Sequence, residues 1–150
     1  KFAELYKQNE FKLLEKVTQQ STKLIFWTTL PLVIVFILFS EKLMLLFGDE
    51  FRVGIFSFIV LSLGRVVVSF SGAAGNLLQM CGKQVIFMNV AIVGSLVNII
   101  LNLSLIPIYG IDGSAIATMI SLIVFNLLLV YFVKREFGFY TFYIPFKKLN

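Results

Sequence analysis

The sequence predicts an all-α protein, a polytopic bundle of transmembrane helices. Its residues are 59% hydrophobic with a mean hydropathy of +0.93, and only 14% are charged, whereas a soluble domain carries about 25%. The charges are also unevenly placed, since none occurs between Lys83 and Asp112 or between Asp112 and Lys134. Apolar runs of about 20 residues can cross the hydrocarbon of a bilayer as helices. The long uncharged runs therefore predict membrane spans.

We expect an amphipathic helix, four spans and a tail. Residues 1–23 alternate apolar and charged residues at helical spacing, which is typical of a solvated connecting helix; a helix that senses the membrane surface is the alternative. The chain opens on Lys1 with no signal peptide, which favours a C-terminal part of a longer protein. The predicted spans cover 24–40, 53–80, 85–106 and 114–133, with turns at 82–84 and 107–113 and an interfacial tail over 134–150.

The distribution of Lys and Arg predicts the orientation. Ten of the thirteen lie in residues 1–23, 82–84 or 134–150, and two lie between the first and second spans. Because cytoplasmic loops carry the excess of positive charge, we expect the first group to be cytoplasmic and the turn at 107–113 to face outward. This topology accounts for the net charge of +5, so nucleic acid is not expected as a partner.

Arg65 is the remaining basic residue and falls inside the span 53–80. A cation there costs about 2.5–3.5 kcal/mol to insert, and no Asp or Glu lies within the predicted spans to neutralise it. Its partner must be a helix outside these four, water or an anionic ligand. On a continuous helix, spacings of four and three place Arg65, Ser69, Gly72, Asn76 and Gln79 on one face.

This face predicts the wall of a polar cavity. The alternative is that Arg65 snorkels to the interface or pairs structurally with a helix outside this chain. The substrate-cavity candidates are Arg65, Ser69, Asn76 and Gln79.

Two further stripes predict helix packing. The span 85–106 carries amides and small residues at helical spacing, and such amides commonly bond a neighbouring helix. The last span begins with a small-residue face that lets another backbone approach closely. The first stripe is Ala91, Ser95, Asn98 and Asn102, and the second is Gly113, Ala117 and Ser121.

Two single residues predict local geometry. Pro31 lies inside the first span, where we expect a kink or hinge and expect Thr28 or a neighbouring helix to satisfy the carbonyl of Trp27. Asp112 lies in the turn 107–113, where it is expected to cap the last span, because a helix N-terminus favours negative charge. The span before that turn is expected to end at Pro107.

Catalytic chemistry is not expected from this chain. It has no His and a single cysteine, Cys81, and Asp49-Glu50 is expected to be a solvated loop rather than an acidic site. We therefore predict no catalytic residue, no metal site and no cofactor, and a membrane enzyme is the least favoured function.

The order of motifs resembles the C-terminal part of polysaccharide flippases of the Wzx/RfbX kind, in the multidrug/oligosaccharidyl-lipid/polysaccharide exporter superfamily. The similar segments are TTLPLVIVFILFSEKLMLLFGDEFRVG, LLQMCGKQ and NIILNLSLIPIYGIDGSAIAT. The likeness extends over about residues 1–135, and its last segment is the most specific.

The resemblance implies part of one six-helix lobe of a MATE-like, two-lobe transporter that works by alternating access in a bacterial or archaeal cytoplasmic membrane. Such proteins flip polyprenyl-diphosphate-linked oligosaccharide repeat units, as used for O-antigen, lipopolysaccharide or capsule. Expected partners are the lipid bilayer, the remaining helices of the same protein and polysaccharide polymerase machinery. A cation-coupled drug or metabolite exporter and a non-transporting assembly subunit remain alternatives, although the predicted spans lack the acids that such exporters usually carry.

Overall fold

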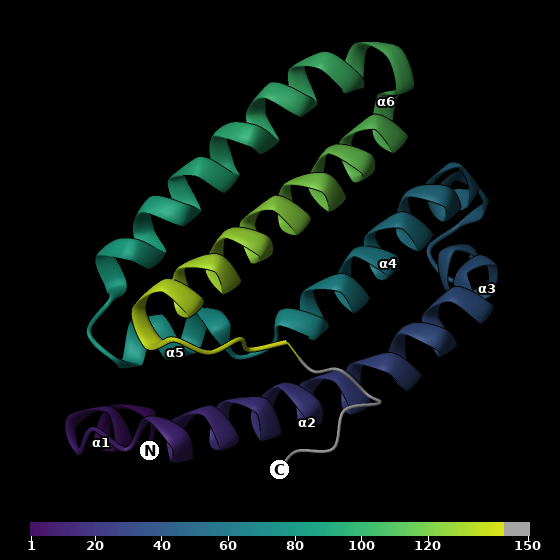
Figure 1. The fold of residues 1–150 in the computed structure, drawn as a ribbon. Helices are drawn as coiled ribbons and strands as arrows, with labels where there is room; N and C mark the ends of the chain where they lie inside the picture. The colour runs from purple at the N-terminus through teal and green to yellow at the C-terminus, as the bar shows by residue number, and fades with distance from the viewer. Residues whose placement is uncertain (143–150) are drawn as a thin grey trace.

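The computed structural model describes residues 1–142, and this part of the chain is built from helices with no strand (Figure 1). It confirms the predicted all-α class. Three segments are long and apolar enough to cross a membrane: Phe11–Leu38, Asp49–Ser71 and Gln84–Phe137. The helices are α1 (Phe2–Lys7), α2 (Phe11–Leu38), α3 (Ser40–Leu45), the 3-10 helix η1 (Asp49–Gly54), α4 (Ile55–Ser71), α5 (Ala74–Met80) and α6 (Gln84–Phe137).

The long helix α6 folds back on itself at Gly110, whose backbone angles (φ 57°, ψ −129°) are not helical. We call residues 84–109 its first arm and 111–137 its second arm; both are drawn side by side in Figure 1. The reversal falls inside the predicted turn 107–113. The prediction that the helix ends at Pro107 is wrong, because helical structure continues past it to Gly110.

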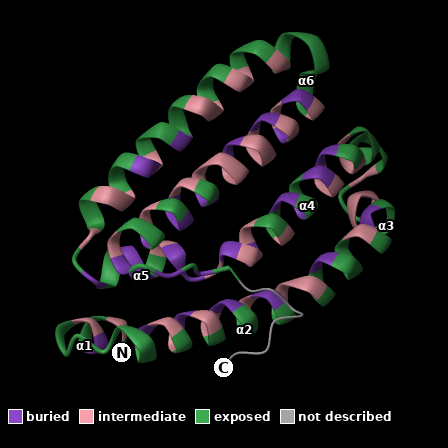
Figure 2. Ribbon diagram, in the orientation of Figure 1, coloured by how far each residue is buried: buried purple, intermediate pink, exposed green. Residues whose placement is uncertain are grey.

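The helices that could span a membrane lie in a row. Figure 1 shows the order first arm of α6, second arm of α6, α4 and α2. Contacts between aromatic rings tie α2 to α4 in antiparallel fashion, with Phe26 against Phe70 and Phe36 against Phe58. Figure 2 shows buried positions along α4 and the second arm, whereas the first arm is largely exposed.

Residues 1–23 do not form the separate helix that their amphipathic pattern predicted. After the short α1, helix α2 begins at Phe11 and continues without interruption to Leu38, passing both the predicted boundary and Pro31. The threonine hydroxyls that could have capped a new helix instead donate hydrogen bonds to carbonyls within α2. Thr18 donates to the carbonyl of Leu14 at 2.7 Å and Thr22 to that of Thr18 at 3.0 Å.

The predicted span 53–80 is wrong as a single helix, because it ends at Ser71 and resumes at Ala74. Gly72 adopts φ 47° and ψ −105°, which a residue with a side chain rarely adopts. A Cβ at this position would lie 2.6–2.8 Å from Thr22 of α2. The break therefore coincides with a close approach of α2 to this segment.

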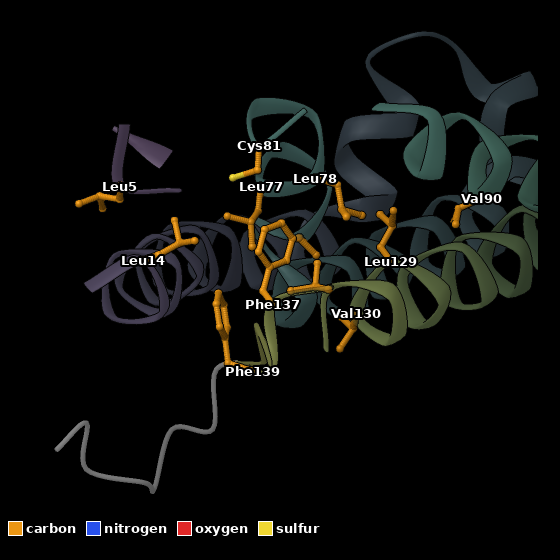
Figure 3. Close-up of a cluster of buried hydrophobic side chains, with 12 residues drawn as sticks. Leu5, Leu14, Leu77, Leu78, Cys81, Val90, Leu129, Val130, Phe137 and Phe139 are labelled. Carbon is orange, nitrogen blue, oxygen red and sulfur yellow. The ribbon is translucent and has the colours of Figure 1, made fainter. Parts of the chain in front are cut away.

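A hydrophobic core closes one end of the row, where α1, the start of α2, α5 and both arms of α6 converge (Figure 3). Leu14, Leu77 and Val133 are fully buried there, and burying each such side chain stabilises the fold by roughly 1.5–3 kcal/mol. Lys83 and Glu136 close the same end with an ion pair of 2.6 Å. The predicted cytoplasmic segments 1–23 and 82–84 and the start of 134–150 meet at this end, and residues 143–150 of that tail lie outside the described range.

Candidate functional site

Arg65 lies on an exposed face of α4, within the segment Asp49–Ser71 that is apolar enough to cross a membrane. Within residues 1–142 its guanidinium makes neither a hydrogen bond nor an ion pair. Arg52 differs, since its guanidinium lies 3.4 Å from the Glu41 carboxylate and the residue precedes the predicted span 53–80. Because a bare guanidinium in hydrocarbon is costly, we expect an anionic or polar partner for Arg65 beyond the described residues.

The other cavity candidates do not gather around Arg65 on one helix face. Ser69 is 2% exposed and donates to the carbonyl of Val66 at 2.6 Å, so it lies on a packed side of α4. Asn76 and Gln79 are exposed on α5, beyond the break at Gly72. The predicted continuous face over 65–79 is therefore wrong, because it required one uninterrupted helix. A role for these four residues in substrate binding remains a prediction.

One buried and one partly buried polar pair join α4 to the second arm of α6. Ser57 donates to the Asp112 carboxylate at 2.7 Å, and Ser71 donates to the amide oxygen of Asn126 at 2.7 Å. Between them, Gly64 approaches Met119 so closely that a Cβ would lie 3.3 Å from its Cγ. The partners in all three contacts are 55 residues apart and recur every seven residues, so the two helices run parallel in a constant register.

Sequence reasoning missed Ser57, Ser71 and Asn126. Asn126 did carry a signal, since it is a lone amide in an apolar span, and such amides rarely stay unpaired. Its partner could not be identified, because that requires knowing which helix lies beside it and in which register.

The expected role of Asp112 as a cap of the last span remains a prediction. Asp112 lies within α6, two residues after the reversal at Gly110, and the hydrogen bond that it accepts comes from the Ser57 hydroxyl of another helix. Because Gly110 leaves helical geometry, Asp112 lies in the first turn of the second arm. Asp112 ties the hairpin of α6 to the start of α4.

In the first arm of α6, the side-chain amides of Asn98 and Asn102 bond within the arm. Asn102 donates from its side-chain nitrogen to the carbonyl and the amide oxygen of Asn98, at 2.9 and 3.0 Å. Bonding of these amides to a neighbouring helix does not occur within residues 1–142, where the Oδ1 of Asn102 is buried without a hydrogen-bond partner. Ser95 and Ala91 occupy the same stripe, with Ser95 exposed and Ala91 partly buried.

The small-residue face of the second arm is turned inward, with Gly113, Ala117 and Ser121 all buried. A Cβ on Gly113 would lie 2.4 Å from the carbonyl oxygen of Leu105 in the first arm. The two arms therefore approach closely at the reversal, where a larger residue would not fit.

The helix break at Gly72 exposes backbone groups that a continuous helix would satisfy. The amide of Ala73 donates to the hydroxyl of Thr22 at 3.4 Å, so α2 supplies a partner for one of them. Pro31, farther along α2, lies within an uninterrupted helix, and Thr28 donates to the carbonyls of Leu24 and Ile25 at 2.9 and 3.0 Å rather than to that of Trp27. The hinge role of Pro31 remains a prediction.

Metal-binding side chains do not cluster in the described part of the chain, where no group of three or more His, Cys, Asp or Glu residues could hold an ion. Cys81 is buried, and this burial raises the pKa of its thiol. Residues 1–142 therefore contain polar contacts between helices and an exposed cation, Arg65, within the predicted span 53–80.

Comparison with known proteins gives two matches. The family model described as MatE matches residues 2–104, which is more than half of the chain. The chain is also 27% identical, over 128 residues, to the probable low-salt glycan biosynthesis flippase Agl15 of Haloferax volcanii. That alignment includes 85% of this chain but 27% of the relative, so the chain spans about a quarter of that protein's length. No solved structure matches the chain.

Proposed function

Because the chain belongs to the MatE family, we propose that the protein containing it flips lipid-linked glycan precursors across a cytoplasmic membrane. The similarity to a probable glycan biosynthesis flippase supports this function over export of drugs or metabolites. We infer a polyprenyl-diphosphate-linked oligosaccharide as the substrate, moved by alternating access with the remaining helices of the same protein. Polymerase machinery is a further partner under this proposal.

The proposal rests on one observation, that Arg65 is exposed within an apolar segment and makes no ion pair there. A diphosphate entering a membrane cavity loses its hydration, and a guanidinium can replace water with bidentate, charge-assisted hydrogen bonds. Arg65 is an exposed cation on α4 that makes no ion pair within residues 1–142. We propose that it binds the diphosphate, with Asn76 and Gln79 contributing amide hydrogen bonds from α5 in a bound state.

The break at Gly72 supplies the flexibility that such a transporter needs. Discontinuous helices in transporters line substrate paths, because their unsatisfied backbone groups are tolerated only in a cavity. Arg65 lies on one side of this break and the two amides on the other. We propose that bending at Gly72 changes the distance between the guanidinium and the amides during transport.

The test is Arg65→Ala in the intact protein, assayed for surface polysaccharide at matched membrane abundance. We expect a loss of at least tenfold, because a charge-assisted pair contributes about 1.5–3 kcal/mol. Arg65→Lys, which keeps the charge but loses the bidentate fork, should retain part of the activity. The matched control is Arg52→Ala, which removes an exposed arginine that precedes the predicted span 53–80 and pairs with Glu41, and it should leave assembly unchanged.

Undiminished polysaccharide in the Arg65→Ala strain would remove Arg65 from the transport path. Efflux of small organic cations that is lost in the same variant, without any polysaccharide defect, would instead assign the protein to drug or metabolite export. A protein that supports assembly while moving no lipid-linked sugar in vesicles would be an assembly subunit.

A further inference from the structure

The exposed face of the first half of α2 carries a row of cations. Lys12, Lys16, Gln20, Lys23 and Trp27 follow one another at spacings of four, four, three and four, which places them on one side of the helix. All five are exposed. The opposite face is buried against the rest of the chain through Leu14, Thr18, Thr22 and Phe26.

The charge of this row is not neutralised within residues 1–142. None of its three lysines makes an ion pair or a hydrogen bond there, in contrast to Lys83 with Glu136. The acidic residue closest in sequence, Glu15, lies off the row and accepts a hydrogen bond from Gln19 at 3.0 Å. The row thus presents three positive charges with no acid among them.

The row ends at a cavity where the polar half of α2 gives way to its apolar half. This cavity has a volume of about 230 Å³ and is lined by Gln20, Lys23, Leu24 and Trp27. An ammonium and an amide on one side can donate to a phosphate, whereas leucine and an indole on the other match glycerol and acyl carbons. The cavity therefore has a polar side and an apolar side, which match the headgroup and the acyl chains of a phospholipid.

The continuity of α2 fixes where this cavity lies relative to a bilayer. A helix of 28 residues is about 42 Å long, roughly 12 Å more than the hydrocarbon core of a bilayer. The apolar half occupies the hydrocarbon, so Lys12 and Lys16 project into the headgroup region. Lys23 and Trp27 then lie at the boundary, where Lys, Arg and Trp are enriched in membrane proteins.

We propose that this row, from Lys12 to Trp27, binds anionic phospholipid of the cytoplasmic leaflet, with the lipid phosphate at Lys23 and Gln20. Basic residues beside a span attract anionic lipids by about 1 kcal/mol each, and the amphipathic cavity adds a defined position for one headgroup. The site holds α2 at a fixed depth in the membrane. This inference does not depend on the transported substrate.

Native mass spectrometry of the intact protein from nanodiscs of mixed phosphatidylglycerol and phosphatidylcholine tests the proposal. Wild type should retain phosphatidylglycerol in preference to phosphatidylcholine. The double variant Lys16→Gln/Lys23→Gln should lower the affinity for phosphatidylglycerol by on the order of 30-fold, since two lysines act. The matched control Lys1→Gln/Lys7→Gln removes the same charge at the same end of the molecule but off the row. This control should keep the wild-type affinity for phosphatidylglycerol.

Each other outcome overturns the assignment. An equal fall in both double variants means that net charge, not the row, attracts the lipid. Equal retention of the two phospholipids in wild type means that no anionic site exists. Displacement of phosphatidylglycerol by an equimolar polyprenyl phosphate assigns the phosphate site to the lipid carrier instead. A loss of thermal stability in pure phosphatidylcholine that is confined to the Lys16→Gln/Lys23→Gln variant means that the row contacts protein.

Discussion

Ser71 at the end of α4 donates a hydrogen bond of 2.7 Å to the amide oxygen of Asn126 in the second arm of α6. Both side chains are buried, with Ser71 2% and Asn126 8% exposed. Asn126 completes the arrangement by donating to the carbonyl of Leu122 at 2.8 Å. The pair therefore fixes the position of α4 along its neighbour at the level where α4 ends.

Replacing Ser71 by Ala should destabilise the protein by about 1–2 kcal/mol, because it leaves the Asn126 oxygen buried without its partner. Thermal unfolding in detergent measures the effect. The control is Ser104→Ala, which removes an exposed hydroxyl bonded only to the carbonyl of Ile100 within its own helix. Equal melting temperatures for the two variants would show that the pair contributes nothing.

Gly72→Ala should be more damaging than Gly82→Ala. Both glycines have positive φ, 47° and 77°, so both substitutions strain the backbone, by about 1–3 kcal/mol. Only at Gly72 would the new methyl group also overlap Thr22, whereas the space around Gly82 is open. Melting temperatures of the two variants separate strain from overlap, and an equal loss would contradict the close approach of α2.

The ion pair between Lys83 and Glu136 predicts a pH dependence. The hydrogen bond and the charge of Glu136 raise the pKa of Lys83 above its ordinary value of 10.5. The folded state therefore holds this proton more tightly than the unfolded state does. The resulting stabilisation is complete below about 10.5 and is lost as the pH rises through the raised pKa.

Accordingly, Glu136→Gln should melt below wild type at neutral pH, and this difference should vanish in strong alkali. Glu41→Gln is the control, because it breaks the exposed pair with Arg52, whose guanidinium stays charged throughout this pH range. A difference between Glu136→Gln and wild type that persists unchanged in strong alkali would rule out Lys83 as the titrating partner.

The orientation predicted from the lysine and arginine distribution can be tested with single cysteines. Cys81 is the one cysteine of these 150 residues, so Cys81→Ala, combined with replacement of any cysteine elsewhere in the intact protein, gives a background without thiols. In this background Glu50→Cys should react with an impermeant maleimide in intact cells, and Gln84→Cys only after permeabilisation. Both positions are exposed, at opposite ends of the row of helices. The reverse labelling pattern would invert the topology.

Much of the fold could be predicted from the sequence because it follows from composition and local turn chemistry. Hydropathy alone identifies segments that can cross a bilayer, and Gly110 marks the reversal of α6 because it adopts a positive φ. These features depend on residues close together in the chain, so they can be predicted without knowing which helices pack against each other.

The features that could not be predicted depend on segments far apart in the sequence. The break at Gly72 contains neither proline nor charge. Thr22 of another helix lies directly against it and accepts a hydrogen bond from the Ala73 amide. A continuous face from Arg65 to Gln79 requires an unbroken helix, and the break at Gly72 separates these residues onto two helices. The hydrogen bond from Ser57 to Asp112 likewise joins two helices whose pairing the sequence does not reveal.

The constant separation of 55 residues between α4 and the second arm of α6 has a consequence for biosynthesis. Ser57 and Ser71 leave the ribosome before Asp112 and Asn126 have been translated. At about 5–20 residues per second, the delay is roughly 3–11 s. During this interval α4 enters the membrane carrying hydroxyls and a guanidinium without their final partners. The hydroxyls of Ser57 and Ser71 therefore gain their partners in α6 only after the hairpin of α6 has been inserted.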